Sequence, residues 1–203
     1  MEEMAGDSSR TRPGGVSVLL VAVRLIQAGL ISILISMIWP ALRGAPWVPS
    51  RRRSVRRMLE MAGVRAGEVV YDLGSGDGRV LIAAARDFGA RSVGVEIDPL
   101  RAWWTRLRVA AVGLRDRVSV VRGDFFTQDL ASADVVVLFL TQATNDRLAD
   151  KLRRELRPGA RVISNRYVLR DWPVAAEDVA ENLRLYVVDG GADEALSASE
   201  IAG

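Results

Sequence analysis

The sequence predicts an α/β domain with a doubly wound, mostly parallel sheet that closes with an antiparallel hairpin, preceded by one transmembrane helix. Three observations support this fold class. From about residue 55, short strand-like runs alternate with longer segments of helical period. The central strand-like runs are continuously apolar, as expected of parallel strands that helices cover on both faces. A 23-residue apolar segment lies in front of the domain.

The composition allows a sizeable core and excludes several kinds of active site. The chain has 203 residues, of which 49% are hydrophobic, which is enough for one domain and an appendage. It contains neither cysteine nor histidine. Disulfides, a thiolate nucleophile, the usual zinc ligands and a histidine general base are therefore excluded. We expect no metal site.

The apolar segment at residues 16–38 contains one charge, Arg24, and one amide, Gln27. At about 1.5 Å per residue, a helix of this length crosses the roughly 30 Å hydrocarbon core of a bilayer. Trp39 follows, and tryptophan favours the membrane interface. We predict a transmembrane helix over residues 16–39. A buried core helix is the alternative, whereas a cleaved signal peptide is disfavoured by the length of the run.

An arginine-rich stretch, VPSRRRSVRRM, follows the predicted span. Residues 43–57 contain six arginines and no acid, so the remainder of the chain carries a net charge of −3. A nucleic-acid-binding protein is expected to carry basic residues over a broad face, whereas here they are concentrated in one stretch. A nucleic-acid partner is therefore disfavoured. The stretch is expected instead to bind anionic lipid headgroups. The residues expected to make this contact are Arg51, Arg52, Arg53, Arg56 and Arg57.

The more basic flank of a membrane span usually lies in the cytoplasm. Here the heavier flank follows the span, so we predict a single-pass protein of the cell membrane with its folded domain on the cytoplasmic side. Residues 40–54 are then a basic juxtamembrane linker.

The domain proper is expected over residues 55–189, between flexible tails at residues 1–15 and 190–203. Helices are predicted at residues 55–62, 79–88, 99–112 and 144–157. Strands are predicted at residues 68–72, 92–96, 118–122, 134–140 and 161–164, with a terminal hairpin of 174–180 and 183–188. Strands that alternate with helices in this order make a mostly parallel, doubly wound sheet.

The stretch YDLGSGDGRV connects the first strand to the next helix and places Gly74, Gly76 and Gly78 in a GxGxG pattern. Glycines permit a sharp turn and the close approach of a ligand to the backbone. Alone this pattern is weak evidence, because dinucleotide-binding enzymes also use a glycine loop. Asp72 precedes the glycines at the strand end, where a carboxylate can pair with an ammonium group. That pairing suits an amino-acid moiety better than a pyrophosphate.

Two further acids lie at strand ends. Glu96 ends the second strand, where it can accept hydrogen bonds from both ribose hydroxyls. Asp124, in RGDFF, follows the third strand, where it can accept from an adenine amine while Phe125 covers the base. Three strand-end acids and a GxGxG loop predict a binding site for S-adenosylmethionine.

Several stretches around these residues resemble one family. They are VPSRRRSVRRMLEMAGV, VVYDLGSGDGRVLIAAA, VGVEIDP, DRVSVVRGDFF and LRPGARVIS. They resemble class I S-adenosylmethionine-dependent methyltransferases. More narrowly, they resemble the archaeal broad-specificity protein lysine methyltransferases and the mitochondrial enzymes that methylate lysine in the c-ring protein of ATP synthase and in the adenine nucleotide translocase. The resemblance covers residues 48–188 and implies a seven-stranded, Rossmann-like methyltransferase sheet.

The resemblance also implies roles for individual residues. Asp72 and the loop from Gly74 to Gly78 would hold the methionine end of the cofactor, Glu96 the ribose and Asp124 the adenine. Ser50, in VPS, would belong to a lid over the cofactor. Thr141 and Gln142, just after the fourth strand, lie where this fold usually admits the acceptor. The Asn/Asp-Pro-Pro-aromatic motif of many base and glutamine methyltransferases is absent there.

We therefore predict a membrane-anchored protein lysine N-methyltransferase whose partner is a membrane-associated protein with an accessible lysine. The alternatives are a lipid or quinone methyltransferase, an RNA methyltransferase, and a non-catalytic cofactor-binding scaffold. A hydroxyl acceptor needs a stronger base than an amine, and the absence of histidine disfavours it. Lys151 is the only lysine in the chain and is expected on a helix surface.

Overall fold

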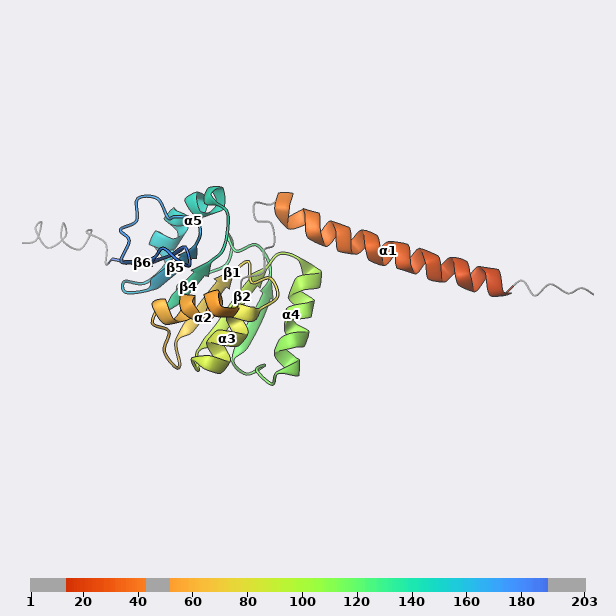
Figure 1. Ribbon diagram of the computed structural model, residues 1–203, viewed down its shortest axis with the longest axis horizontal. Coiled ribbons are helices and arrows are strands. Elements are labelled where there is room, and N and C mark those ends of the chain that lie inside the picture. Colours follow the sequence, from red (N-terminus) through yellow and green to blue (C-terminus); the bar gives the residue numbers. More distant parts are fainter. Residues whose placement is uncertain (1–13, 43–51, 190–203) are drawn as a thin grey trace, which may run out of the picture.

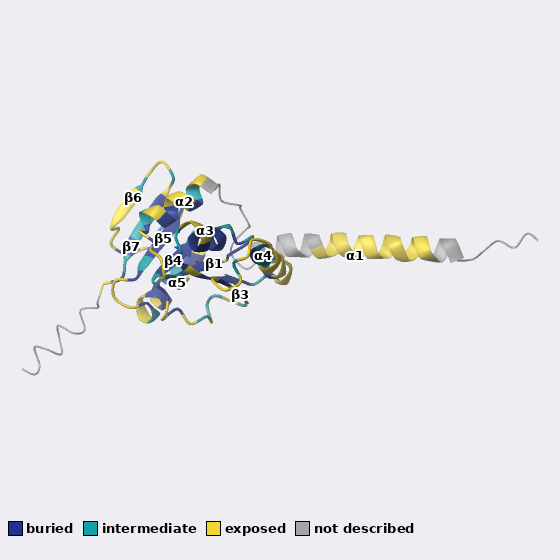
Figure 2. Ribbon diagram, turned by 90° about the horizontal axis from the view of Figure 1, so that it is seen from below, coloured by how far each residue is buried: buried dark blue, intermediate teal, exposed yellow. Residues whose placement is uncertain are grey.

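The computed structural model describes residues 14–42 and 52–189, with side chains described for residues 18–32 and from Arg53 onward. The first helix, α1 (Gly14–Leu42), contains the predicted segment 16–39 and lies outside the α/β domain (Figure 1). Its described side chains are all exposed (Figure 2). Within the part of the chain that the structure describes, no helix meets the length and hydropathy that a membrane crossing requires.

The remaining elements form the predicted α/β domain. The strands are β1 (Val69–Leu73), β2 (Arg91–Glu96), β3 (Val118–Arg122), β4 (Val135–Leu138), β5 (Arg161–Asn165), β6 (Ala176–Asp178) and β7 (Leu183–Val187). The helices are α2 (Arg52–Met61), α3 (Arg79–Asp87), α4 (Pro99–Ala111) and α5 (Gln142–Glu155). All the predicted strands and helices of the domain are present, with shifts of a few residues at their ends.

The seven strands form one mixed sheet in the order β3-β2-β1-β4-β5-β7-β6. The five strands from β3 to β5 are parallel, whereas β7 pairs antiparallel with β5 and with β6. The predicted terminal hairpin is confirmed. The strand order reverses between β1 and its neighbours β2 and β4, and in such sheets ligands bind at the carboxyl ends of the strands beside this point.

Helices cover both faces of the sheet (Figure 1). On one face, α2 and α3 pack on the central strands through Val55, Met58 and Ala84, and α4 packs beside α3. On the other face, α5 packs through Leu148 and Leu152. Coverage on both sides explains why β4 is apolar along its whole length and completely buried.

Helix α2 begins at Arg52, three residues before the predicted start, so part of the predicted linker is helical. One face of α2 buries apolar side chains, and the other carries the arginines. These arginines form ion pairs: Arg53 with Glu181, Arg56 with Glu60, and Arg57 with Asp178. Ser54 also donates a hydrogen bond to Glu181 at 2.7 Å. Arg53, Ser54 and Arg57 therefore connect α2 to the end of β6 and the turn after it.

Candidate active site

The glycine loop between β1 and α3 is held by its own hydrogen bonds. Gly74, Gly76 and Gly78 all have positive φ angles, which glycine adopts without strain. The amides of Gly74 and Ser75 donate to the Val95 carbonyl, at 2.9 and 3.1 Å, and that of Gly78 donates to Ser75. Loops that bind diphosphates direct their amides at the ligand. Here these amides are used within the protein, which favours a cofactor without a diphosphate.

Glu96 ties this loop to the start of α4. It is 4% exposed, and its carboxylate accepts hydrogen bonds from the backbone amides of Gly76 and Asp98, both at 2.9 Å. Burial raises the pKa of Glu96, and the two amide hydrogen bonds oppose that rise. Each carboxylate oxygen retains a second acceptor position, so Glu96 can still bind a diol.

Asp72 is the residue whose surroundings most clearly require a ligand. Its side chain is 5% exposed, and no hydrogen bond reaches it from any residue that the structure describes. Burial, with the nearby charges of Glu96 and Asp77, raises the pKa of Asp72 to about 7. A buried carboxylate without a partner is costly. A bound ammonium group would supply both the missing charge and the missing donors.

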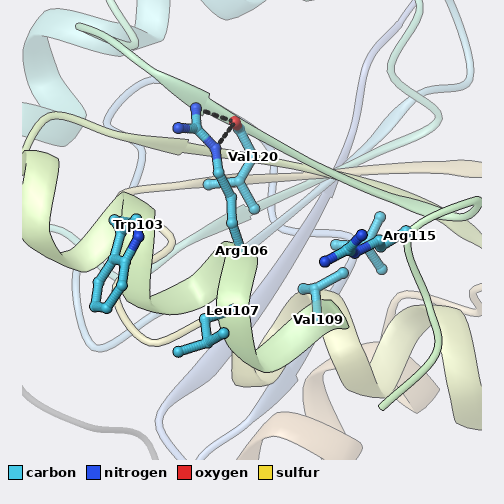
Figure 3. Close-up of a pocket in the computed structure, with 7 residues that line it drawn as sticks. Trp103, Arg106, Leu107, Val109, Arg115 and Val120 are labelled. Carbon is cyan, nitrogen blue, oxygen red and sulfur yellow. Dashed lines mark hydrogen bonds between the residues drawn. The ribbon is translucent and has the colours of Figure 1, made fainter. Parts of the chain in front are cut away.

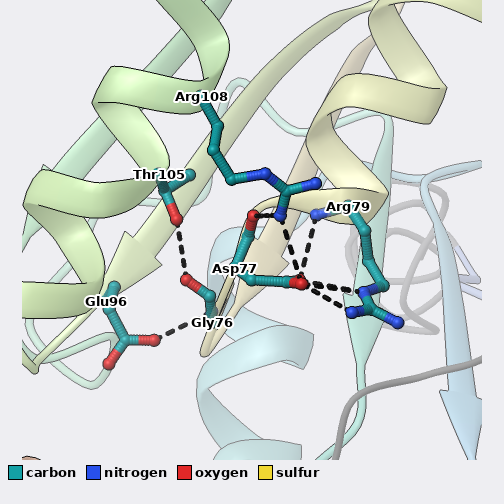
Figure 4. Close-up of polar contacts among 6 residues, drawn as sticks. All are labelled: Gly76, Asp77, Arg79, Glu96, Thr105 and Arg108. Atoms are coloured by element: carbon teal, nitrogen blue, oxygen red, sulfur yellow. Dashed lines mark hydrogen bonds and ion pairs between the residues drawn. The ribbon is translucent and has the colours of Figure 1, made fainter.

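Asp77 and two arginines hold the outer side of the loop (Figure 4). The Asp77 carboxylate binds Arg79 at 2.6 Å and Arg108 at 3.1 Å. Burial favours the neutral acid, but these arginines outweigh it and lower the pKa of Asp77 below its usual value. Arg108 also donates to the Asp77 carbonyl, and Thr105 donates to the Gly76 carbonyl at 2.8 Å. The loop is thus fastened to α4 as well as to β2.

The predicted adenine-binding residues lie after β3. Asp124 is exposed, and one of its oxygens accepts from the Phe126 amide at 2.9 Å. Phe125 is half-buried against the core between the sheet and α5. The centroid of its ring lies 4.8 Å from that of Phe126. Arg147 covers the Phe126 ring at 4.1 Å. Phe125 and Asp124 remain the predicted adenine contacts.

The two predicted acceptor-pocket residues have structural roles at the start of α5. Thr141 caps this helix by accepting from the Thr144 amide. Gln142 donates to Asp146 and to the Val168 carbonyl, at 2.7 and 3.0 Å, and accepts from the Val168 amide. Gln142 therefore clamps the loop after β5. Both residues lie at the carboxyl ends of the strands, as Asp72 does. The side-chain amide of Gln142 already donates to Asp146 and to Val168.

The predicted lid residue Ser50, and Arg51 beside it, lie outside the described residues. The structure also adds three positioning residues that the sequence did not single out: Asp98, Thr105 and Arg108. Asp98 caps α4 by accepting from Leu100 and Arg101, and Pro99 occupies the first turn. The Asp-Pro pair is a recognisable helix start and could have been found. The bonds from Thr105 and Arg108 depend on tertiary contact and leave no signal in the sequence.

The sequence model of the ANTKMT methyltransferase domain family matches residues 72–176, about half of the chain. The chain belongs to this family. The match begins at Asp72 and spans the glycine loop, Glu96 and Asp124.

Relatives and a solved structure agree with this family. The chain is 44% identical to a protein-lysine N-methyltransferase of Saccharolobus islandicus, over 63% of this chain and 80% of the relative. It is 33% identical to an adenine nucleotide translocase lysine N-methyltransferase of Mus musculus, over 79% of this chain and 68% of the relative. A structure of an RNA methyltransferase from Salinibacter ruber with S-adenosyl-L-homocysteine is 38% identical, with a TM-score of 0.69, over 71% of this chain and 95% of that chain.

The residues of this methyltransferase fit S-adenosylmethionine, the cofactor of the family. Asp72 has a buried carboxylate without a hydrogen bond among the described residues, as the ammonium of the cofactor's methionine part would need. Glu96 retains acceptor positions that ribose hydroxyls would fit, and the hydroxyl of Ser75 is a buried polar atom without a hydrogen bond among the described residues. The enzyme is an S-adenosylmethionine-dependent methyltransferase of a family that includes curated protein-lysine N-methyltransferases.

The cofactor-free protein should be stabilised by Asp72→Asn, on the order of 2 kcal/mol at pH 8. The unfolded-state pKa is 3.8 and the folded-state value about 7, so the folded chain binds the extra proton between these values. Wild-type stability therefore falls as pH rises from about 4 to about 7 and then levels off. The advantage of the variant should grow over that window in denaturant titrations.

The matched control is Asp150→Asn, a change at an exposed carboxylate on α5. This control should not show the same growth with pH. An advantage of Asp72→Asn that is the same at pH 4.5 and pH 8 would contradict the assignment of a raised pKa to Asp72.

Proposed function

We propose that this enzyme transfers the methyl group of S-adenosylmethionine to the side-chain amine of a lysine in another protein. The observation that carries the acceptor assignment is the 44% identity to a protein-lysine N-methyltransferase over 80% of that relative. The absence of histidine and cysteine also supports an amine acceptor, because a neutral amine attacks without a strong base.

The residues of the chain bind and orient more than they catalyse. When bound, S-adenosylmethionine supplies a sulfonium methyl group that a neutral amine can attack in line with the leaving sulfur. Asp72 would hold the ammonium end and Glu96 the ribose, and the hydrogen bonds of the glycine loop would keep these two groups at a fixed distance. Such alignment lowers the barrier by proximity and orientation. The incoming lysine has a free pKa near 10.4, and desolvation at the site lowers it toward the neutral form.

The only lysine of the chain is not available as an acceptor. Lys151 is 8% exposed and donates to both carboxylate oxygens of Glu155 at 2.6 Å. Glu155 in turn accepts from the Leu130 amide at 3.2 Å. The sequence-based expectation that Lys151 lies on a helix surface is wrong. This burial supports an acceptor lysine on a separate protein.

RNA is the second candidate acceptor. It is favoured by the Salinibacter ruber structure, which is described as an RNA methyltransferase and is 38% identical to this chain. The labelling experiment described below decides between the two acceptors, because protein and RNA are separated before the label is counted.

We also propose that α1 holds the enzyme at the cell membrane as a single pass, with the catalytic domain on the cytoplasmic side and a membrane-associated protein as substrate. The described side chains of α1 are mostly apolar and exposed, with exposed fractions such as 68% for Leu25. A helix that exposes apolar side chains all round needs an apolar environment. Contact of the arginine-rich stretch with anionic headgroups remains a prediction.

Incubation with methyl-labelled S-adenosylmethionine and total cell protein, lipid and RNA should label protein only, at lysine Nζ by mass spectrometry. Glu96→Ala should abolish labelling for two reasons. The glycine loop loses its link to α4, and the ribose of the cofactor loses the carboxylate that accepts its hydrogen bonds. Lys151→Arg should keep full activity, since the ion pair with Glu155 is retained. Label in the RNA fraction would replace the lysine proposal with the second candidate, and label on Lys151 itself would contradict the argument from burial.

The full chain expressed in cells should remain in the membrane fraction after washing at high pH, which removes peripheral proteins. Added protease should digest the domain only when it reaches the cytoplasmic face. Release of the enzyme by the wash would contradict the single pass. Digestion from the outer face would contradict the orientation.

A further inference from the structure

The outer face of α4 exposes a stripe of large apolar side chains, which we call the α4 surface. Its members are Leu100, Trp103, Trp104 and Leu107, with exposed fractions of 45%, 60%, 50% and 47%. Their spacing of three and four residues puts them on one side of the helix. The opposite side buries Ala102 and Val109 against α3 and the sheet. A contiguous apolar surface of this kind is uncommon on a protein without a partner for it.

A groove runs between the α4 surface and β3, one of the two edge strands of the sheet (Figure 3). It encloses about 370 Å³ and is lined by Trp103, Leu107 and valines of α4 and β3. Arg106 and Arg115 also line it. Arg106 is fixed by donating to the Val120 carbonyl at 3.1 and 2.8 Å. The groove therefore combines apolar walls with two guanidinium groups.

Arginines outnumber acids in the segment that contains the α4 surface. Residues 100–122 contain six arginines and one acid, Asp116, although Arg108 is paired with Asp77. Among the described residues, nothing forms a hydrogen bond or ion pair with the guanidinium groups of Arg115 and Arg117. On α2, by contrast, Arg53, Arg56 and Arg57 are each paired with an acid. The sequence indicated the arginine-rich stretch as the single basic region, but Arg115, whose guanidinium group has no partner among the described residues, lines the same groove as Trp103.

We propose that the α4 surface docks on the surface of a bilayer that contains anionic phospholipid. Tryptophan favours the level of the headgroups, where its ring is in an apolar setting and its N–H is hydrated. Leu100 and Leu107 lose contact with water there, and Arg115 and Arg117, which follow α4, contact lipid phosphates. Such a combination of apolar stripe and flanking cations is how interfacial helices bind membranes.

Two other occupants fit these features less well. A single-stranded nucleic acid would stack bases on Trp103 and Trp104. It would leave Leu100 and Leu107 in water, however, and these make up half of the stripe. A second copy of this chain would bring arginines against arginines across a symmetric contact, which repels.

The docking has a consequence for the reaction, one that rests on the proposed function. Helix α4 begins at Pro99, three residues after Glu96. The α4 surface therefore starts near the carboxyl ends of the strands, where the predicted cofactor-binding residues lie. A bilayer contact here brings the site close to lysines that project from a membrane surface. The contact itself requires neither α1 nor the chemistry.

A single fluorescent label tests the docking, because the chain contains no cysteine. The full chain with Leu107→Cys is labelled, and quenching by acrylamide is measured with vesicles of phosphatidylcholine alone and with added phosphatidylglycerol. The matched control carries the label at Val179→Cys. Val179 is 76% exposed and lies after β6, at the opposite edge of the sheet from β3.

Anionic vesicles should shield the label at position 107 and leave the label at position 179 accessible. Arg115→Gln and Arg117→Gln should each raise the lipid concentration needed for half-shielding about fivefold. Equal accessibility at position 107 with and without vesicles would overturn the proposal, as would equal shielding at both positions. Shielding that grows with protein concentration alone would assign the surface to a second copy, and shielding by RNA alone would assign it to nucleic acid.

Discussion

The hydrogen bonds from the amides of Gly76 and Asp98 to Glu96 are the interactions on which the rest of the site depends. They join the glycine loop, the end of β2 and the first turn of α4 through one buried carboxylate. Thr105 and Arg108 extend the same connection along α4. Because α4 is fixed to the loop, anything that α4 contacts is held at a fixed distance from the cofactor. The cofactor site and the α4 surface are in this sense two ends of one rigid unit.

This arrangement has a cost at Asp72. Its carboxylate lies in the interior beside Glu96 and Asp77, without a cation among the described residues. Buried charges without partners destabilise a fold unless a ligand or a proton neutralises them. Because its pKa is raised, Asp72 holds a proton below about pH 7, and a bound ammonium group can replace that proton. The same buried carboxylate that destabilises the free protein therefore favours the binding of a cationic ligand.

Sequence patterns predicted most of the domain, because its strands are continuous apolar runs and its helices have clear periods. The glycine loop and the acids Asp72 and Glu96 were also predictable, since strand ends of a parallel sheet meet at one edge. The start of α2 was missed because its side chains find their acids, Glu181 and Asp178, more than 120 residues later. The burial of Lys151 was missed for the same reason, since its partner Glu155 and its surroundings are set by packing. The α4 surface was overlooked because its tryptophans follow an ordinary helical period.

Calorimetric titration with S-adenosyl-L-homocysteine between pH 6 and pH 8.5 tests the central role of Asp72 most directly. If the bound ammonium replaces a proton on Asp72, binding in buffers of different ionisation enthalpy should release close to one proton at pH 6 and almost none at pH 8.5. The affinity should fall as the pH drops below about 7, by up to tenfold per unit. An affinity that is constant over this range, with no proton released, would contradict the account.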